Sequence, residues 1–323
     1  MQQLIQELGL TSEANMNQNS ETLDPALFVP LPEQDKHGEE IVRKSRTYWQ
    51  EVGHRLKKDR LAVAGLVFII AFTVLAILGP MLSPYTYDGQ DYSSRNQPPS
   101  LQHLCGTDKL GRDIFVRILY GARISLTIGF AAAALNLIIG TIYGSIAGYF
   151  GGRVDLIMMR IVDLLTGLPS LLYIILIMMF LGSNIGSILI ALCITSWLET
   201  ARLVRSQVLS LKHSDYVLAA QSMGAPTKMI LSQHLIPNSV GVIIVTVTFL
   251  VPSVIFQEAF LSFLGIGIQV PVASWGTLAN EAIASLFTHP YQMLFPVLAI
   301  SLTMFALNFL GDGLRDALDP RLK

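Results

Sequence analysis

The chain has 323 residues, of which 52% are hydrophobic and only 14% are charged. A soluble domain of average composition carries about 25% charged residues, so these proportions argue against an ordinary soluble enzyme and against intrinsic disorder. The 22 basic and 23 acidic residues nearly balance, which gives no indication of a nucleic-acid partner. Two cysteines, Cys105 and Cys193, exclude a disulfide-rich scaffold and a zinc site made of cysteines. The composition therefore predicts an integral membrane protein.

The first sixty residues are polar and precede the first long apolar run. Residues 1–44 are predicted to form a flexible tail, because they are rich in asparagine, glutamine, proline and charge. Residues 45–60 have two open interpretations, an amphipathic helix that lies on the membrane or a solvated linker with an aromatic anchor. The apolar side of such a helix would consist of Tyr48, Trp49, Val52 and Leu56.

Six apolar stretches are long enough to cross a bilayer. The first, residues 61–80, has no charge and covers about 30 Å as a helix, which is the thickness of a bilayer core. The other five are expected near residues 124–150, 154–182, 185–203, 239–267 and 293–311. Prolines inside helices remove a hydrogen bond, so kinks are expected at Pro169, Pro252 and Pro296. The sequence therefore predicts an all-α integral membrane protein with six transmembrane helices.

The distribution of lysine and arginine predicts the orientation of these spans. Cytoplasmic segments of membrane proteins carry an excess of basic residues. If the N-terminus lies inside, most of the 22 basic residues fall on the cytoplasmic side. The exceptions, all within or next to the first outer loop, are Arg95, Lys109, Arg112, Arg117 and Arg123. We therefore expect both termini in the cytoplasm, with 1–44 as a cytoplasmic tail.

Three glycines recur at every fourth position of the second span: Gly140, Gly144 and Gly148. Residues four apart share one face of a helix, and a face of glycines lets a neighbouring helix approach closely. These residues are predicted to serve helix packing.

Few ionisable residues fall inside the predicted spans. Arg160 and Asp163 are three residues apart, so they share a helix face and can neutralise each other as a structural pair. Together with Glu258 they are also candidates for the translocation path or for a polar contact between subunits. Glu258 is more isolated and either lines a polar pathway or forms a hydrogen bond to a partner helix. A proton-coupled carrier would use Glu258 or Asp163 as its titrating group, although no clear internal repeat supports that class.

The sequence contains no recognisable catalytic set. It lacks the G-x-x-x-x-G-K-[ST] phosphate loop and the H-E-x-x-H zinc motif, and its six histidines are scattered. We therefore predict no enzymatic activity, no metal site and no cofactor bound by this chain.

The segment 202–238 between the fourth and fifth predicted spans is too apolar for a solvated linker. A short helix is expected over residues 216–223, with Gly224 in the left-handed conformation that ends it. Pro226 suits the first turn of a second helix, which is expected to stop before Pro237. The result would be a helix–turn–helix elbow whose small residues, Ala219, Ala220 and Gly224, fit a cleft in another protein. A self-packed re-entrant loop is the alternative.

This elbow resembles the E-A-A loop of permease subunits in binding-protein-dependent ABC importers. The shared pattern is Ala219-Ala220-x-x-x-Gly224, followed by Pro237 in a Leu-Ile-Pro-Asn stretch. The motifs GTDKLGRD, YGARISL, EAFLSFLG and GDGLRDALDPR at residues 106–113, 120–126, 258–265 and 311–321 resemble the C-type permease subunit of bacterial oligopeptide and dipeptide importers. The likeness runs from about residue 45 to the end. Leu218 departs from the family's pattern, which has glutamate before the two alanines.

This resemblance implies a type I ABC importer permease fold in the bacterial inner membrane, with both termini cytoplasmic. Residues 45–120 would hold the lead-in, the first span and an extracytoplasmic loop, and residues 121–323 a five-helix core. The implied partners are a second, related permease subunit, two ATPase subunits that bind ATP and Mg²⁺, and an extracytoplasmic binding protein that delivers peptide. Permeases for nickel or other small solutes are the alternative within the same family.

The resemblance also assigns roles to individual residues. The outer loop 81–120 and the segment 269–292, with Trp275, are expected to face the binding protein. The elbow is expected to couple the permease to an ATPase through Tyr216, Leu218, Ala219, Ala220, Gly224, Ala225, Pro226 and Pro237.

Overall fold

The computed structural model describes residues 47–319 of the chain, so the predicted tail 1–44 lies outside the described residues. Helices dominate the described part, which confirms the predicted all-α class. The long helices are α3 (Arg60–Leu82), α4 (Ile114–Phe150), α7 (Ile185–Leu211), α10 (Ile236–Phe263) and α12 (Tyr291–Leu318). The shorter ones are α2 (Tyr48–Lys58), α5 (Gly152–Gly167), α6 (Ser170–Leu181), α8 (Asp215–Ser222), α9 (Thr227–Met229) and α11 (Trp275–Ala282). Single turns η2 (Tyr92–Ser94) and η4 (Ile283–Ser285) and the π-helical η3 (Ile230–Leu235) complete the set.

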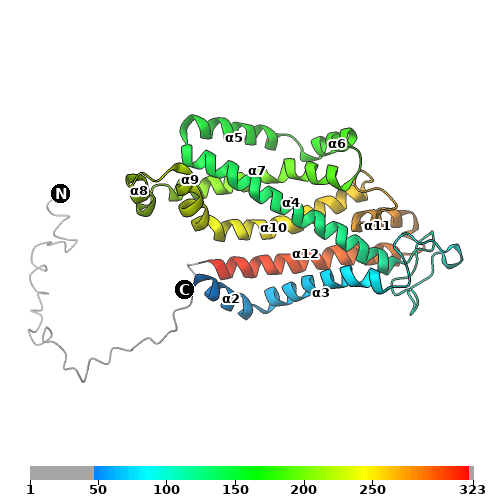
Figure 1. Ribbon diagram of the computed structural model, residues 1–323. Coiled ribbons are helices and arrows are strands. Elements are labelled where there is room, and N and C mark those ends of the chain that lie inside the picture. Colours follow the sequence, from blue (N-terminus) through cyan, green and yellow to red (C-terminus); the bar gives the residue numbers. More distant parts are fainter. Residues whose placement is uncertain (1–46, 320–323) are drawn as a thin grey trace, which may run out of the picture. The chain divides into compact units, whose positions relative to one another are not determined.

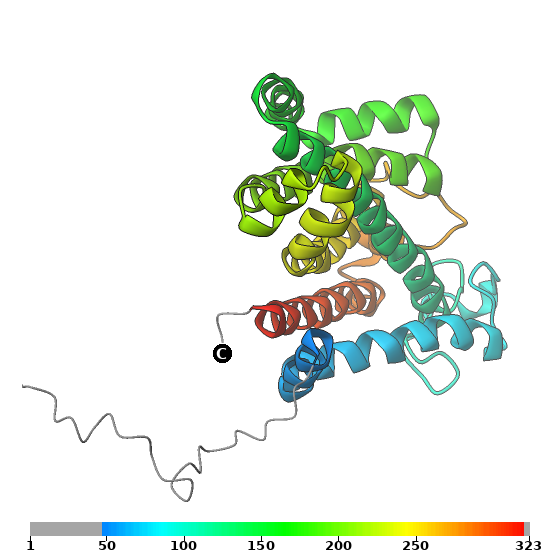
Figure 2. The ribbon, with the colours of Figure 1, turned by 60° about the vertical axis from the view of Figure 1, so that its left-hand side comes forward.

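Helix α4 is the central element of the bundle. It contacts α7 along one side and α10 and α3 along another, while α12 packs against both α3 and α10 (Figure 1). Figure 2 shows α5 and α6 on the opposite side of the bundle from α3 and α12. The two largest clusters of buried apolar side chains lie where α4 meets α10, and they extend to α3 and α12 on one side and to α6 and α7 on the other.

Five described helices are long and apolar enough to cross a membrane, and α5 with α6 makes a sixth if the pair counts as one span. The two helices of that pair meet at an angle of 85°. The break falls at Leu168 and Pro169, where a kink was predicted, because Pro169 cannot donate a backbone hydrogen bond. Pro252 and Pro296, in contrast, lie inside helices that continue past them.

Helix α4 begins earlier than the sequence pattern predicts. The Asp113 carboxylate accepts a hydrogen bond of 2.8 Å from the Val116 amide and caps the first turn. The helix then has 37 residues and a length of about 55 Å, which exceeds a bilayer core. The domain boundary expected between residues 120 and 121 is therefore wrong, since it falls inside one continuous helix.

The predicted lead-in helix is α2, which begins after its N-cap residue Thr47. Val52 is buried against Ala317 and Leu318 near the end of α12, so α2 packs on the bundle. Tyr48 and Trp49 remain more than half exposed. A solvated linker is thus excluded, because the segment has an apolar face with a defined partner.

Candidate functional site

The elbow between α7 and α10 begins with the short helix α8. Gly224 follows it with φ of +78°, the left-handed conformation expected from the sequence. The Ala225 amide donates to the Ala220 carbonyl at 3.0 Å, and the Gly224 amide donates to the Gln221 carbonyl at 2.9 Å. This pair of bonds is the Schellman arrangement, which satisfies the last carbonyls of a helix and turns the chain. The turn then leads into α9 and η3.

One side of the elbow is anchored to the bundle by apolar contacts. Val217 of α8 and Ile230 and Leu235 of η3 are almost completely buried. They form one cluster with Val204 and Val208 of α7. Because α7 leads into the elbow and also packs on α4, the elbow is connected to the membrane helices through α7.

The other side of the elbow is exposed and largely uncharged. Tyr216, Leu218 and Met223 have exposed fractions of 40%, 44% and 82%, and Ala219 and Gly224 are exposed between them. Ala220 is buried and Ala225 half-buried, so these two hold the turn from inside. Leu218 therefore adds apolar surface to this exposed face.

The second half of the elbow differs from the prediction. A helix was expected to stop before Pro237, but η3 continues directly into α10 and Pro237 lies in the first turn of α10. The reason is that η3 is a π-helix, whose wider turn makes i→i+5 hydrogen bonds. The carbonyls that need a donor near Pro237 therefore differ from those in a regular α-helix. Pro226 and Pro237 are both exposed.

The three glycines of α4 face α7. A Cβ at Gly140 would lie 2.6 Å from the Thr200 Cβ, and one at Gly144 would overlap the Ala201 carbonyl oxygen. A Cβ at Gly148 would lie 2.8 Å from the Arg205 carbonyl oxygen. The absence of side chains thus allows the two backbones to touch, and α7 is the helix that the glycine spacing requires.

Glu258 of α10 is completely buried inside its own chain. Its two carboxylate oxygens accept hydrogen bonds from Ser125 of α4 at 2.8 Å and from Ser262 of α10 at 2.9 Å. The carboxyl group therefore joins α4 to α10. This hydrogen bond to a partner helix is one of the two interpretations of Glu258 that the sequence left open.

The predicted pair of Arg160 and Asp163 does not form. Asp163 instead accepts a hydrogen bond of 2.9 Å from Arg202 of α7, which also reaches the Thr166 hydroxyl at 3.1 Å. Arg160 is exposed on α5. The prediction failed because a neighbouring helix offers Asp163 a better-placed guanidinium than its own helix does.

Trp275, expected to contact a binding protein, has no exposed surface. Its indole Nε1 donates to the Ile118 carbonyl at 3.1 Å, and its ring stacks on Phe72 at a centroid distance of 6.0 Å. The side chain therefore fastens α11 to α4 and α3. This burial corrects the assignment of Trp275 to a surface contact.

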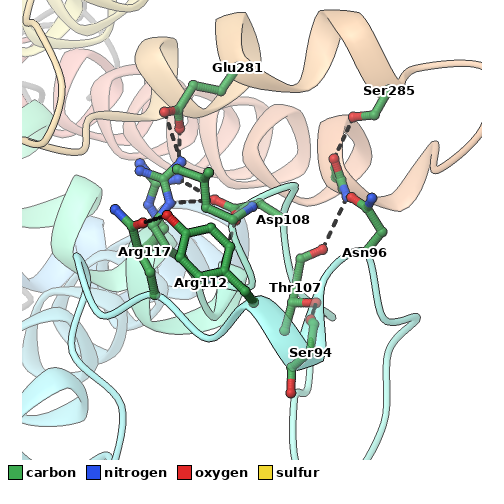
Figure 3. A network of polar contacts seen from close by, with 12 residues as sticks. Ser94, Asn96, Thr107, Asp108, Arg112, Arg117, Glu281 and Ser285 are labelled. Carbon is green, nitrogen blue, oxygen red and sulfur yellow. Dashed lines mark hydrogen bonds and ion pairs between the residues drawn. The ribbon is translucent and has the colours of Figure 1, made fainter.

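A largely buried cluster of four charged side chains joins the start of α4 and the residues before it to α11, and it was missed at the sequence level (Figure 3). Arg112 contacts Asp108 at 2.7 Å and Glu281 at 2.8 Å. Arg117 contacts the same two carboxylates at 2.8 Å and 2.6 Å. We call the end of the bundle that holds the connection 83–113, α11 and this charge cluster the loop end, and the opposite end the elbow end.

The loop end also perturbs its titratable groups. Burial alone would lower the pKa of Arg112, but its bonds to Glu281 and the charge of Asp108 raise that pKa overall. Burial raises the pKa of the Cys105 thiol to about 11, and the charge of Asp113 acts in the same direction. His103 binds Asp113 at 2.8 Å, so the N-cap residue of α4 is itself held in place.

A polar pocket of about 410 Å³ opens where α5 and α6 meet. It is lined by α7 and α10 in addition to the helix break, and it contains Glu199, which the sequence analysis overlooked. Within residues 47–319, no group of histidine, cysteine, aspartate and glutamate side chains is arranged to hold a metal ion.

Comparison with known families adds to this geometry. Residues 140–323 match the family described as the binding-protein-dependent transport system inner membrane component. Residues 47–99 match the N-terminal transmembrane domain of oligopeptide transport permease C. The first match covers more than half of the chain and includes the elbow.

Individual relatives extend over nearly the whole chain. The dipeptide transport system permease protein DppC of Bacillus subtilis (strain 168) is 48% identical over 97% of this chain and 98% of its own length. The oligopeptide transport system permease protein OppC of the same organism is 48% identical over 92% of this chain and 97% of its own length. Among solved structures, a chain of the inward-facing MetNI methionine ABC transporter is similar with a TM-score of 0.50 and 16% identity, over 64% of this chain and 96% of that chain. At that identity the structural likeness concerns the fold alone.

Proposed function

Since this chain belongs to the binding-protein-dependent transport system inner membrane components, we propose that it forms part of a peptide-conducting pathway in an ATP-driven importer. As a member it is a non-catalytic, multi-pass permease subunit of a bacterial inner membrane transport system. The observation that carries the peptide assignment is the near-complete coverage of two relatives, named dipeptide and oligopeptide permeases, at 48% identity.

The proposed assembly has four kinds of component. An extracytoplasmic binding protein delivers the peptide, and this chain pairs with a second, related permease to enclose the pathway. Two ATPase subunits bind ATP and Mg²⁺ on the cytoplasmic side. Such an importer carries its substrate by alternating access, in which the two permeases open first to one side of the membrane and then to the other.

In this proposal the elbow end is cytoplasmic and the elbow transmits ATPase closure. The supporting geometry is an exposed apolar face, carried by Leu218, Ala219 and Met223, on a helix whose other face is anchored through Val217. When these apolar side chains insert into a cleft of the ATPase, the contact excludes water and α8 moves with the ATPase. Because Val217 contacts the cluster that holds α7, such a motion reaches α7 and then α4.

The first test is isolation of the complex. Mild-detergent purification of the tagged chain, followed by mass spectrometry, should recover a second permease and proteins with phosphate-binding loops. The same complex in proteoliposomes, supplied with its binding protein, should take up a labelled di- or tripeptide only when ATP is present. Recovery of the chain alone after cross-linking, or uptake without ATP, would turn the assignment toward a self-sufficient carrier.

The second test addresses the elbow with a matched pair of glycines. Gly224 and Gly152 both have positive φ, of 78° and 52°, and a Cβ at either position would meet no atom within 4 Å. Gly224→Leu and Gly152→Leu therefore impose similar backbone strain, but only the first lies on the elbow. We expect Gly224→Leu to abolish peptide uptake while ATP hydrolysis continues, and Gly152→Leu to keep both. Equal behaviour of the two variants would count against coupling through the elbow.

A further inference from the structure

The polar pocket at the break between α5 and α6 is unusual for a membrane-spanning region. Three separate segments supply its polar lining: the helix break, α7 and α10. The polar side chains at the wall are Thr166, Ser170, Tyr173, Thr195, Ser196, Glu199, Ser253 and Gln257. The sequence separation of these segments shows that the bundle, and no single local motif, brings them together.

Glu199 is the one carboxylate of this pocket. It lies in α7, about 21 Å along the helix from Ile185, and is therefore well inside a span. Its side chain is exposed, and within residues 47–319 its carboxylate has no hydrogen-bond or ion-pair partner. An unpaired carboxylate at this depth is costly in lipid, because charges in the hydrocarbon are stabilised only by a partner or by water.

The surface of α3 provides the contrast. Its exposed side chains are apolar along its length and include Val67, Ile70, Val74 and Leu78. Such a surface is suited to lipid tails, which cannot satisfy hydrogen-bonding groups. The lining around Glu199 is mainly polar, with Leu168, Pro169, Leu198 and Leu250 as its apolar part, and a polar lining suits water rather than lipid.

The nearest basic residue on the same helix is not available to Glu199. Arg202 follows one turn later but is engaged by Asp163 and Thr166. The charge of Glu199 thus remains open to a cation that enters the pocket. Across the pocket, the Gln257 amide donates to the Ser253 hydroxyl at 3.3 Å, so neutral polar groups are placed to contact peptide backbone.

We propose that Glu199 lines the transport pathway and binds the ammonium group of a peptide during its passage. This inference rests on the proposed peptide transport. The ammonium can belong to the peptide's amino terminus or to a lysine side chain, since both present the same charge and the same donors. Glu199 then serves as a transient contact after the binding protein has released its cargo.

The test uses the complete importer in proteoliposomes with three variants of this chain. Glu199→Gln removes the charge at constant shape, Glu199→Asp retains it, and Asp312→Asn removes an exposed carboxylate on α12 as the control. Each is tested with a lysine-free tripeptide and with a tripeptide that contains one lysine. The readout is the number of peptides taken up per ATP hydrolysed.

We expect Glu199→Gln to lower this ratio about tenfold, the scale of one charge-assisted hydrogen bond, and Glu199→Asp to recover most of it. A loss for both peptides identifies the amino terminus, and a loss for the lysine peptide alone identifies the side chain. An unchanged ratio for both peptides overturns the inference while leaving peptide transport intact. If the parent importer takes up neither peptide, the proposed function fails instead.

Water access provides a second measurement that does not depend on transport rates. In the assembled importer, Glu199→Cys should react with a water-soluble, cationic methanethiosulfonate, and a transported peptide should slow that reaction. The native Cys105 and Cys193 are both buried, which keeps the background low. Complete protection of the cysteine would show that lipid or the second permease covers this face, and would overturn the inference.

Discussion

At the loop end four charged side chains form one largely buried cluster, whereas the ion pair between Arg202 of α7 and Asp163 of α5, nearer the elbow end, lies near the surface. Arg117 is 1% exposed between Asp108 and Glu281, but the Arg202–Asp163 pair is 41% and 54% exposed. Breaking a buried cluster leaves uncompensated charge, and breaking an exposed pair leaves ions that water can solvate. The charge cluster thus holds the loop end in one arrangement, while the Arg202–Asp163 pair can rearrange at little electrostatic cost.

The largest effect is expected from removing one member of the buried cluster. Arg117→Met leaves Asp108 and Glu281 to share a single guanidinium, which should destabilise the fold by about 3–5 kcal/mol. The measurement is thermal unfolding of the purified chain in detergent. The double variant Arg117→Met with Glu281→Gln should recover part of the loss. A melting temperature unaffected by Arg117→Met would show that the charge cluster does not stabilise the loop end more than an exposed ion pair does.

The next effect concerns the thiol at the loop end. With a pKa of about 11 in place of 9.0, Cys105 should have about a hundredfold lower thiolate fraction near pH 8 than an ordinary thiol. Alkylation by a maleimide, followed by mass spectrometry of the Cys105 peptide, should therefore accelerate about tenfold per pH unit toward pH 11. Because the pKa of Cys105 is higher in the folded chain than in the unfolded chain, the contribution of the neutral thiol to folding stability is fully present below about pH 9. It is lost as the pH rises through 11. Reaction at the rate of a free thiol near pH 8 would contradict the buried loop end.

A smaller effect is expected where α4 passes α7 between the two ends. Gly144→Ala places a Cβ against the Ala201 carbonyl oxygen and should cost about 1–3 kcal/mol. Gly53→Ala on α2 is the control, because its Cβ would meet nothing within 4 Å and alanine favours helix by up to about 1 kcal/mol. Thermal unfolding should therefore move in opposite directions for the two variants, and a shared direction would show that the helices separate easily.

The smallest effect is expected at the elbow end. Arg202→Ala removes the partner of Asp163, and such exposed pairs contribute less than about 1 kcal/mol. Thermal unfolding should change by little, and added salt should reduce even that difference. A loss as large as that of Arg117→Met would mean that both ends are equally rigid.

Local pattern predicted the features that depend on neighbours along the chain. The length of the apolar stretches predicted most of the spans, Pro169 predicted the break between α5 and α6, and Gly224 predicted the end of α8. The continuity through Pro237 was not predictable in this way, because a π-helical turn depends on how η3 packs against α7.

The features that depend on distant segments were missed. Arg112 and Glu281 are separated by 169 positions, and nothing near either residue indicates the other. Trp275 was assigned to the surface because its segment connects two spans, yet a partner on α4 buries it. Glu199 was not predicted as a site residue, because the pocket around it is formed by Ser253, Gln257 and the helix break. Only the folded bundle brings these segments together.

The unbroken length of α4 has a further consequence. Arg117 near its start belongs to the charge cluster, and Gly148 near its end faces α7 closely. One continuous helix therefore fixes the rotation and the spacing of these two residues relative to each other. Inserting a single residue midway would rotate everything beyond it by about 100° and shift it by about 1.5 Å. Either the arginine or the glycine would then point the wrong way. An insertion or deletion of one residue between the two ends is therefore expected to disrupt the contacts of one of them, whereas a substitution leaves their relative rotation unchanged.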